Sequence, residues 1–324
     1  MIRSVVLGCG GYLPEKKVTN KDLEQIMETS DDWIVERTGI RQRYFAAEGQ
    51  YTSDLAIEAS RQALANAGLD ASEIDLVIVG TTTPDRTFPA VATRVQAALG
   101  AVPGSPAFDV QAVCSGFLYA LGAADSMLRN GMAKNALVIG AETLSRILDF
   151  EDRTTAVLFG DGAGAVVLQA RESRGGLEDP GVISVHLHAD GRYNDILNTD
   201  GGVSMTRTAG SVRMLGKEVF RHAVVNLHDV LLETLKANGL TAQDVDWVVP
   251  HQANLRIIEG TVKRLGLDMS QVICTIDRHA NTSAASVPLA LADGMASGLV
   301  KPGQLVLLEA MGGGLTWGGA LVRL

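Results

Sequence analysis

The chain has 324 residues, of which 46 % are hydrophobic, so it can bury a large core and is long enough for two domains or one duplicated domain. Its formal net charge of -9 disfavours nucleic acid as a partner, because phosphate binding depends on accumulated Lys and Arg. No apolar run approaches the roughly 20 residues of a membrane span. The three scattered cysteines have neither pairing nor metal-ligand spacing, so we expect a cytoplasmic protein that binds no membrane.

The first forty residues predict short elements. Residues 1–7 indicate a strand that leads into a glycine turn at 8–11, followed by a helix over 21–28. A second short helix should begin after the N-cap Ser30 and stop at Gly39.

On that second helix Trp33 and Arg37 lie four residues apart and therefore share a face. A packed tryptophan with a solvent-directed arginine fits this spacing, and so does a pair of ligand contacts. The spacing alone leaves both interpretations open.

A helix–turn–strand unit occurs twice along the chain. Residues 53–67 have the apolar spacing of a helix and residues 74–79 that of a strand. The segment 63–79 (ALANAGLDASEIDLVIV) aligns with 234–250 (TLKANGLTAQDVDWVVP) at one constant shift. Two amphipathic units can resemble each other by chance, but a duplicated α/β half explains the match better.

If the halves are equivalent, their border lies in the polar stretch 169–181, which gives halves of 1–172 and 173–324. Each half alternates strands and helices, which implies mostly parallel sheets covered on both faces. The elements expected in the second half are strands at 182–188, 245–249, 272–276 and 305–309 and helices at 214–238 and 283–296.

A cysteine stands at a strand-to-helix junction. Residues 107–110 predict a short buried strand, and apolar residues recur at helical spacing after Ser115. Unpaired N–H groups and the helix dipole at such a junction favour a thiolate, so we expect a lowered pKa for Cys114. The other interpretation of a lone cysteine in an apolar run is a small buried hydrophobe.

Two further strand ends carry polar residues. His251 follows the expected strand 245–249, and Asn281 follows 272–276 just before a helix. Ligands bind at the carboxyl ends of strands in open α/β sheets, so Cys114, His251 and Asn281 should meet in one cleft as a nucleophile set. A helix cap at Asn281 and a structural role for His251 are the alternatives.

Two other patterns bear on ligands. The glycines at 312–314 come after the last expected strand and lack the Walker lysine and the Rossmann spacing, but their backbone N–H groups could serve an oxyanion hole. His186 and His188 share one face of a strand, yet no carboxylate or cysteine stands beside them at ligand spacing, so we expect no metal.

Several motifs occur together and in order from residue 5 to the C-terminus. They are AVCSGF around Cys114, GDGAGA from Gly160, HQANLRI from His251, DRHANTSAASVPLAL from Asp277 and EAMGGGLTWG from Glu309. This combination resembles the β-ketoacyl-acyl carrier protein synthase III family of the thiolase-like superfamily. The resemblance implies an acyltransferase with a thiolase-like α/β fold, built from two duplicated halves in five αβαβα layers.

The activity implied by the resemblance is decarboxylative condensation of an acyl-CoA primer with malonyl-acyl carrier protein, which gives a 3-oxoacyl-acyl carrier protein and initiates fatty acid synthesis. Cys114 would carry the acyl group, with the thioester oxygen held by the N–H groups of Cys114 and Gly313. His251 and Asn281 would bind the malonyl thioester carbonyl and stabilise the enolate. Acyl-CoA is then a substrate, and no cofactor is expected.

The resemblance also implies binding contacts. Trp33 and Arg153 would enclose the CoA adenine, and Arg37 would approach its phosphates. Phe88 would enter the acyl pocket of a partner subunit and make the enzyme a homodimer. The other acyl-pocket residues are Leu144, Phe159 and Met311.

A local basic patch interrupts the overall negative charge. Arg256, Lys263 and Arg264 share one face of a helix, and Arg221 adds to them. Acyl carrier proteins are acidic, so this patch would bind the carrier protein; a solvated helix face is the other interpretation.

The sequence departs from the family pattern at three positions. Met311 and Leu315 replace common phenylalanines, and Ala280 replaces a common glycine. Met311 could enlarge the acyl site, so primer length and branching stay open. The alternative functions are a synthase III-like acyltransferase or starter enzyme of secondary metabolism and, in another class, a thioesterase-type hydrolase.

Overall fold

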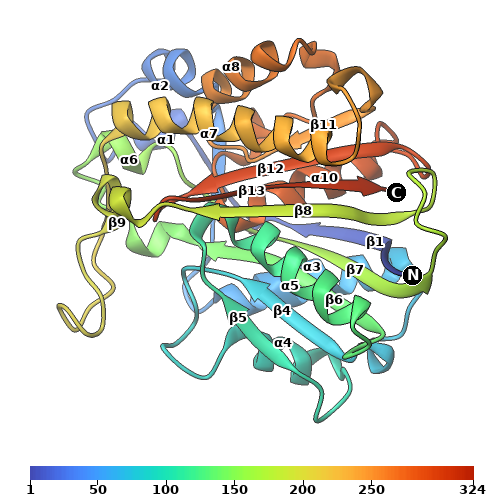
Figure 1. Cartoon of the computed structure of the whole chain (residues 1–324). Helices are drawn as coiled ribbons and strands as arrows, with labels where there is room; N and C mark the ends of the chain where they lie inside the picture. The colour runs from blue at the N-terminus through green and yellow to red at the C-terminus, as the bar shows by residue number, and fades with distance from the viewer.

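Two large β-sheets organise the computed structural model, which describes residues 1–324 (Figure 1). The first sheet has the strand order β1-β7-β6-β4-β5 and the second β11-β12-β13-β8. The bounds are β1 (Ile2–Tyr12), β4 (Leu76–Gly80), β5 (Ala107–Val110), β6 (Asn135–Thr143) and β7 (Asp161–Glu172), then β8 (Gly181–Ala189), β11 (Trp247–Pro250), β12 (Leu305–Gly312) and β13 (Thr316–Arg323). Each expected half therefore contains one sheet, and the border at residue 172 stays a prediction.

The remaining elements are helices and two small hairpin-like sheets. The helices are α1 (Asn20–Leu23), α2 (Asp31–Thr38), α3 (Thr52–Ala67), α4 (Val91–Leu99), α5 (Gly116–Arg129), α6 (Arg153–Ala156), α7 (Gly216–Ala237), α8 (Leu255–Leu265), α9 (Ile276–His279) and α10 (Ser286–Ala296). The small sheets pair β2 (Lys16–Thr19) with β3 (Gln42–Phe45) and β9 (Leu197–Thr199) with β10 (Val212–Met214). None of the helices is long and apolar enough to cross a membrane.

Helices α5 and α10 lie between the two sheets and form the central layer. Phe117 of α5 and Val287 of α10 share one core with Ile78 of the first sheet and Val306 of the second. Helices α3 and α4 cover the outer face of the first sheet, and α7 and α8 cover that of the second. Figure 1 shows the resulting stack of five layers, which confirms the expected αβαβα arrangement.

The duplicated segments adopt the same structure. The order helix, 3-10 turn and strand occurs at α3, Ala71–Glu73 and β4, and again at α7, Ala242–Asp244 and β11. One aspartate after each turn has an equivalent role. Asp75 accepts a hydrogen bond from the N–H of Asn135 at the start of β6 (2.8 Å), and Asp246 accepts one from Leu305 at the start of β12 (2.7 Å).

The expectation of mostly parallel sheets is wrong. Four of the seven neighbouring strand pairs in the two sheets are antiparallel, since β7 pairs with β1 and β6, and β13 pairs with β12 and β8. In the second sheet the cause is the extra strand β13 after the glycine loop, which was expected to follow the last strand; in the first sheet β7 takes the same antiparallel place between β6 and β1. Three residues between β12 and β13 allow only a hairpin, because a parallel partner needs a long crossover.

The glycines at 8–11 do not form the expected turn but continue strand β1. A Cβ on Gly8 would lie 2.4 Å from the backbone nitrogen of Ala67, and one on Gly10 would lie 2.3 Å from the carbonyl oxygen of Ala59. Both contacts are with α3. The glycines therefore allow close approach of strand and helix rather than a change of chain direction.

The expected helix over 21–28 covers only α1 and ends at Leu23. The chain turns there because the carboxylate of Glu24 accepts a hydrogen bond from the N–H of Asp31 at the start of α2 (2.7 Å). Helix α2 itself has the expected bounds, with Ser30 as N-cap and Gly39 in the left-handed conformation at its end.

The expected strand at 272–276 is also wrong. Only one bridge forms, between Val248 and Val272. The next donor in a parallel ladder would be the backbone N–H of residue 250, which is proline and has none. The side-chain amide of Gln252 replaces it and donates to Ile273 O (3.2 Å), while its oxygen accepts from Thr275 N (2.8 Å). The chain is thus released from the sheet early and reaches Asn281 through the short helix α9.

Candidate active site

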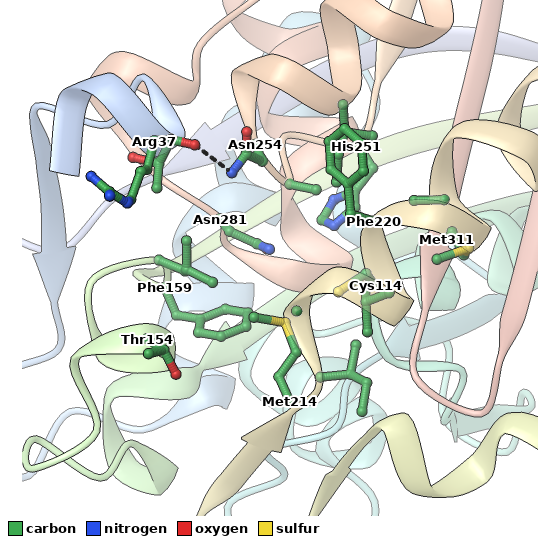
Figure 2. Close-up of a pocket in the computed structure, with 18 of the residues that line it drawn as sticks. Arg37, Cys114, Thr154, Phe159, Met214, Phe220, His251, Asn254, Asn281 and Met311 are labelled. Atoms are coloured by element: carbon green, nitrogen blue, oxygen red, sulfur yellow. Dashed lines mark hydrogen bonds between the residues drawn. The ribbon is translucent and has the colours of Figure 1, made fainter. Parts of the chain in front are cut away.

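One cavity of about 320 Å³ is lined by the side chains of Cys114, His251 and Asn281. Cys114 comes from the turn before α5, His251 from the end of β11 and Asn281 from the turn before α10. Figure 2 shows the sulfur, the imidazole ring and the amide directed toward the same space. The lining is mostly hydrophobic and includes no aspartate or glutamate. The structure therefore brings together the three residues that the sequence singled out.

Cys114 lies in a 3-10 turn, Val113–Ser115, rather than in the first turn of α5. Val113 adopts the left-handed conformation (φ 48°), which lets the chain reverse between β5 and α5. The thiol is buried, and burial raises its pKa to about 12, although a hydrogen bond with the Ser283 side chain acts in the opposite direction. The expected lowered pKa is therefore wrong, because loss of solvation outweighs the effect of the helix start.

The glycine loop lies against the cysteine turn. A Cβ on Gly312 would be 2.6 Å from the backbone nitrogen of Cys114, so only glycine permits this approach. The hydroxyl of Thr316 holds the two turns together through contacts with Ser115 Oγ (2.8 Å) and the Ala112 carbonyl (3.0 Å). The N–H of Gly313 has no hydrogen-bond partner in the chain, so it is available to a substrate oxygen.

His251 is neutral in this environment. The ring is buried, and burial lowers its pKa to about 3. At pH 7 the ring therefore carries one proton, on one of its two nitrogens. Its Nδ1 lies 2.6 Å from the hydroxyl of Ser286, at the start of α10. Its backbone N–H donates to the carbonyl of Glu309 (2.8 Å), which fixes the ring at the end of the sheet.

Asn281 is held by its own backbone and by its side-chain oxygen. The main chain exchanges two hydrogen bonds of 3.0 Å with Leu158 and Gly160, and Oδ1 accepts the N–H of Ser283 (2.9 Å). Because that oxygen must face a donor, the NH₂ group of the amide points toward the cavity. The site consequently presents an amide donor next to a neutral imidazole.

A buried carboxylate behind the cavity was missed by the sequence reasoning. Glu142, at the end of β6, accepts hydrogen bonds from the backbone of Thr82 and Thr83, from the hydroxyls of Thr81 and Thr83, and from Ser283 Oγ (3.0 Å). Burial raises its pKa to about 7. A charged residue directly after the apolar run 136–141 was the available signal.

Trp33 and Arg37 form one wall at the cavity mouth. Asn254 donates to the carbonyl of Arg37 (3.0 Å) and so joins α2 to the start of α8 (Figure 2). The guanidinium of Arg153 lies 5.0 Å from the centre of the Trp33 ring and donates to Glu28 O (2.8 Å). Two stacking distances of about 3.5 Å each are needed to enclose an adenine, so Arg153 must move before a ring can enter.

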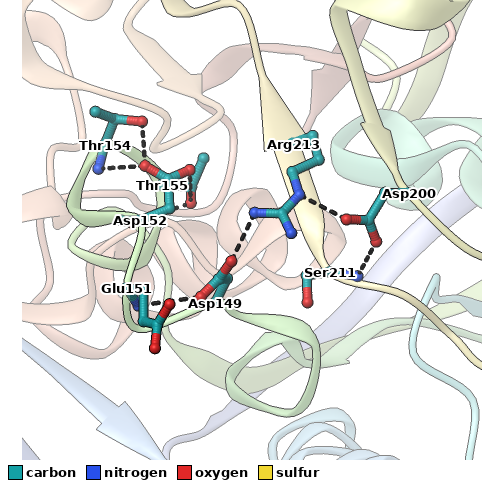
Figure 3. A network of polar contacts seen from close by, with 8 residues as sticks. All are labelled: Asp149, Glu151, Asp152, Thr154, Thr155, Asp200, Ser211 and Arg213. Atoms are coloured by element: carbon teal, nitrogen blue, oxygen red, sulfur yellow. Dashed lines mark hydrogen bonds and ion pairs between the residues drawn. The ribbon is translucent and has the colours of Figure 1, made fainter.

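Another part of the rim is braced by Arg213 of β10 (Figure 3). Its guanidinium donates to Asp200 and Asp149, both at 2.7 Å. The hydrogen bond from Arg213 lowers the pKa of Asp149, and Ser211 N–H together with Arg213 lowers the pKa of Asp200. Since Met214 lines the cavity, this network holds its wall in place.

Only two of the four residues expected in the acyl pocket line the cavity. Phe159 and Met311 line the cavity, and the Met311 sulfur accepts a hydrogen bond from Asn226 Nδ2 at 3.9 Å. Leu144 is buried outside the lining, in the same hydrophobic cluster as Phe159. Phe88 is 81 % exposed and lies outside the cavity of its own chain.

The basic residues lie on the surface. Arg256, Lys263 and Arg264 are exposed on α8, and Arg256 donates to the carbonyl of Glu36 (2.9 Å). Arg221 on α7 pairs with Glu218, so part of its charge is neutralised.

The two histidines of β8 meet a carboxylate that the sequence did not reveal. His186 and His188 both contact Glu233 of α7, at 3.3 and 2.6 Å. The pairing joins the sheet to the helix that covers it, and the three side chains do not form a metal-binding group.

Comparison with known proteins gives consistent matches. Models described as 3-oxoacyl-[acyl-carrier-protein] synthase III and as its C-terminal part match residues 108–191 and 235–324. A beta-ketoacyl-[acyl-carrier-protein] synthase III of Rhodospirillum rubrum is 65 % identical over 324 residues, 100 % of both chains. A crystal structure of 3-oxoacyl-[acyl-carrier-protein] synthase III from Aquifex aeolicus has a TM-score of 0.93 and 44 % identity, covering 99 % of this chain and 100 % of that one. A priming β-ketosynthase of a polyketide pathway has a TM-score of 0.92 and 36 % identity, covering 99 % and 96 %. The expected thiolase-like fold is thereby confirmed.

The raised pKa of Cys114 predicts the pH dependence of its alkylation. Only the thiolate reacts, and burial raises the thiol pKa to about 12, so the rate with iodoacetamide should rise about tenfold per pH unit between pH 6 and 9. Intact mass measures the rate, and Cys114→Ala gives the background from Cys9 and Cys274. A plateau below pH 8 would mean that the helix start outweighs burial.

Proposed function

The chain belongs to the 3-oxoacyl-[acyl-carrier-protein] synthase III family, and we propose that in this member Cys114 carries the acyl group while His251 and Asn281 act on the malonyl thioester. The protein is an acyltransferase that condenses an acyl-CoA with malonyl-acyl carrier protein and initiates fatty acid synthesis. One observation carries the assignment of roles. A buried thiol shares an apolar cavity with two uncharged hydrogen-bond donors and no carboxylate.

The first half-reaction transfers the acyl group to Cys114. The sulfur attacks the thioester carbonyl of acyl-CoA, and the oxyanion is bound by the N–H groups of Cys114 and Gly313. The C–S bond to CoA then breaks, and the CoA sulfur leaves with the proton that the thiol of Cys114 has lost. No group of the protein stays protonated after this exchange, so the step needs no strong base and no cofactor.

The second half-reaction forms the carbon–carbon bond. Malonyl-acyl carrier protein loses carbon dioxide, and the electron pair of the broken C–C bond becomes an enolate whose oxygen accepts hydrogen bonds from His251 and Asn281. The enolate carbon attacks the acyl thioester, and the Cys114 thiolate leaves and takes up one proton from water, which restores the thiol. Because the imidazole is neutral, it can donate to the oxyanion without carrying the second proton that would quench the carbanion.

Contacts with CoA and with the carrier protein are proposed for the residues around the cavity mouth. Trp33 and Arg37 line one end of the cavity and Arg153 lies beside the Trp33 ring; the three are proposed to hold the nucleotide part of CoA. The exposed Arg256, Lys263 and Arg264 are proposed to attract the acidic carrier protein against the overall negative charge of the chain.

A homodimer is proposed from the exposed apolar side chains of two loops. Phe88 is 81 % exposed, Met205 is 81 % exposed and Val203 is 62 % exposed. A second copy that covers them would receive Phe88 in its acyl pocket, with Leu144, Phe159 and Met311. A cytoplasmic location is proposed because Cys9, Cys114 and Cys274 are all unpaired.

The alternative functions have weaker support. Identity to the Rhodospirillum rubrum enzyme is 65 % over the whole chain, against 36 % to the priming ketosynthase of a polyketide pathway. A hydrolase needs a base for water, and the cavity lining contains no carboxylate, so only the neutral His251 could take that role. Steady release of free acid from acyl-CoA without malonyl donor would favour the hydrolase.

Asn281→Ala should separate the two half-reactions. Intact mass should show Cys114 acylated from a panel of acyl-CoAs as in the wild type, whereas condensation with malonyl-acyl carrier protein should fall by about 10²- to 10³-fold, because one oxyanion donor is lost. The exposed Asn194→Ala serves as the matched control. Equal loss of both half-reactions would contradict the assigned role, and failure of the wild type to acylate Cys114 would sink the proposed mechanism.

Arg256→Glu should raise the KM for malonyl-acyl carrier protein about tenfold, since a rim charge that attracts the partner is reversed. Acylation from acyl-CoA should keep its rate, which also checks that the hydrogen bond to Glu36 is not needed for folding. Lys236→Glu, at the far end of α7, is the control. The same KM increase in both variants would remove the patch from the interface.

Phe88→Asp should convert the dimer to a monomer, because a charge replaces an apolar contact at the proposed interface. Light scattering measures the mass, and Met132→Asp, which changes a 64 % exposed side chain elsewhere, is the control. Dimers of unchanged stability in Phe88→Asp would exclude this loop from the interface.

A further inference from the structure

The hydroxyl of Ser286 is the only side-chain partner of the His251 ring. Ser286 Oγ lies 2.6 Å from Nδ1, and both residues are buried. The other ring nitrogen, Nε2, makes no hydrogen bond within the chain, and His251 lines the cavity. The neutral ring has one proton for these two nitrogens, so its position decides whether the cavity meets a donor or an acceptor.

The surroundings of Ser286 determine the direction of the short hydrogen bond. Its oxygen is approached by the backbone N–H of Gln252 (3.4 Å), which can only donate. Its own proton has no acceptor other than His251 Nδ1, because the hydroxyl makes hydrogen bonds only with that nitrogen and with the Gln252 N–H. If His251 donated as well, the buried hydroxyl proton would have no acceptor, which costs about 1–3 kcal/mol.

We propose that Ser286 is a positioning residue, which donates its proton to His251 Nδ1 and thereby keeps the ring proton on Nε2, facing the cavity. The backbone N–H of Gln252 orients the hydroxyl for this donation. Ser286 itself does not line the cavity.

The consequence for catalysis rests on the proposed role of His251. With the proton on Nε2, the imidazole and the Asn281 amide both donate to one oxygen of the substrate. In the other tautomer Nε2 presents a lone pair and repels the enolate oxygen. The hydroxyl thus acts on decarboxylation and condensation, and leaves transfer of the acyl group to Cys114 untouched.

The tautomer can be measured without any activity. In the wild-type protein labelled with ¹⁵N-histidine, the His251 signals, assigned with His251→Gln, should show a protonated Nε2 and an unprotonated Nδ1 at pH 7. A protonated Nδ1 would overturn the proposal. This result stands apart from the proposed function, because it is independent of which reaction the cavity performs.

Kinetics of Ser286→Ala test the consequence. Condensation should fall by about tenfold or more, because the donor is no longer fixed, while acylation of Cys114 stays within about twofold. Ser286→Thr keeps a hydroxyl and should restore condensation. Ser60→Ala removes another buried hydroxyl, which donates to Ala56 O (2.6 Å), and should change neither rate. Unchanged condensation in Ser286→Ala, or equal loss of both rates, would contradict the proposal; if that variant does not fold, the ¹⁵N measurement still decides.

Discussion

The buried carboxylate of Glu142 is the contact on which the geometry of the cavity depends. It stands at the end of β6 in the first sheet and accepts hydrogen bonds from the loop that follows β4 and from Ser283, which precedes α10. Every one of its partners donates, which favours the ionised form, whereas burial raises its pKa to about 7. A buried charge is tolerated only with such complete hydrogen bonding, so the carboxylate fixes the relative positions of the elements that donate to it.

Three of the four non-glycine residues with positive φ lie in the turns that carry Cys114 and Asn281. They are Val113 (φ 48°), Ala280 (φ 58°) and Ser283 (φ 50°). Left-handed or glycine-like conformations of such residues cost about 1–3 kcal/mol each and persist only where the surroundings determine them. The hydrogen bonds of Asn281 with Leu158 and Gly160 and the contact of Ser283 with Glu142 restrain the second and third of these residues. The hydroxyl of Thr316, which contacts Ser115 and Ala112, restrains the turn of the first. The strained turns direct Cys114 and Asn281 into one space.

Local patterns in the sequence were enough to predict the strand and helix around Cys114, the duplicated unit and the meeting of the three cavity residues. These patterns gave a wrong strand where a side chain takes over a hydrogen bond that the backbone would otherwise make. The apolar run at 272–276 predicts a strand, but the missing N–H of Pro250 and the amide of Gln252 end the ladder after one bridge. The lowered pKa expected for Cys114 failed for another reason. Helix position is visible in a sequence, whereas the loss of solvation depends on packing between distant segments.

The position of the single proton on the His251 ring decides whether the cavity favours carbon–carbon bond formation or hydrolysis. A thioesterase built from cysteine, histidine and asparagine must activate water, which requires an acceptor at the nitrogen that faces the substrate. In this cavity the hydroxyl of Ser286 occupies Nδ1 of His251, so the nitrogen left for the substrate carries the proton. No carboxylate lines the cavity to take over as base. If Cys114 carries the acyl group as proposed, water beside it meets neither a carboxylate nor an imidazole acceptor, so the thioester would survive until a carbon nucleophile is generated beside it.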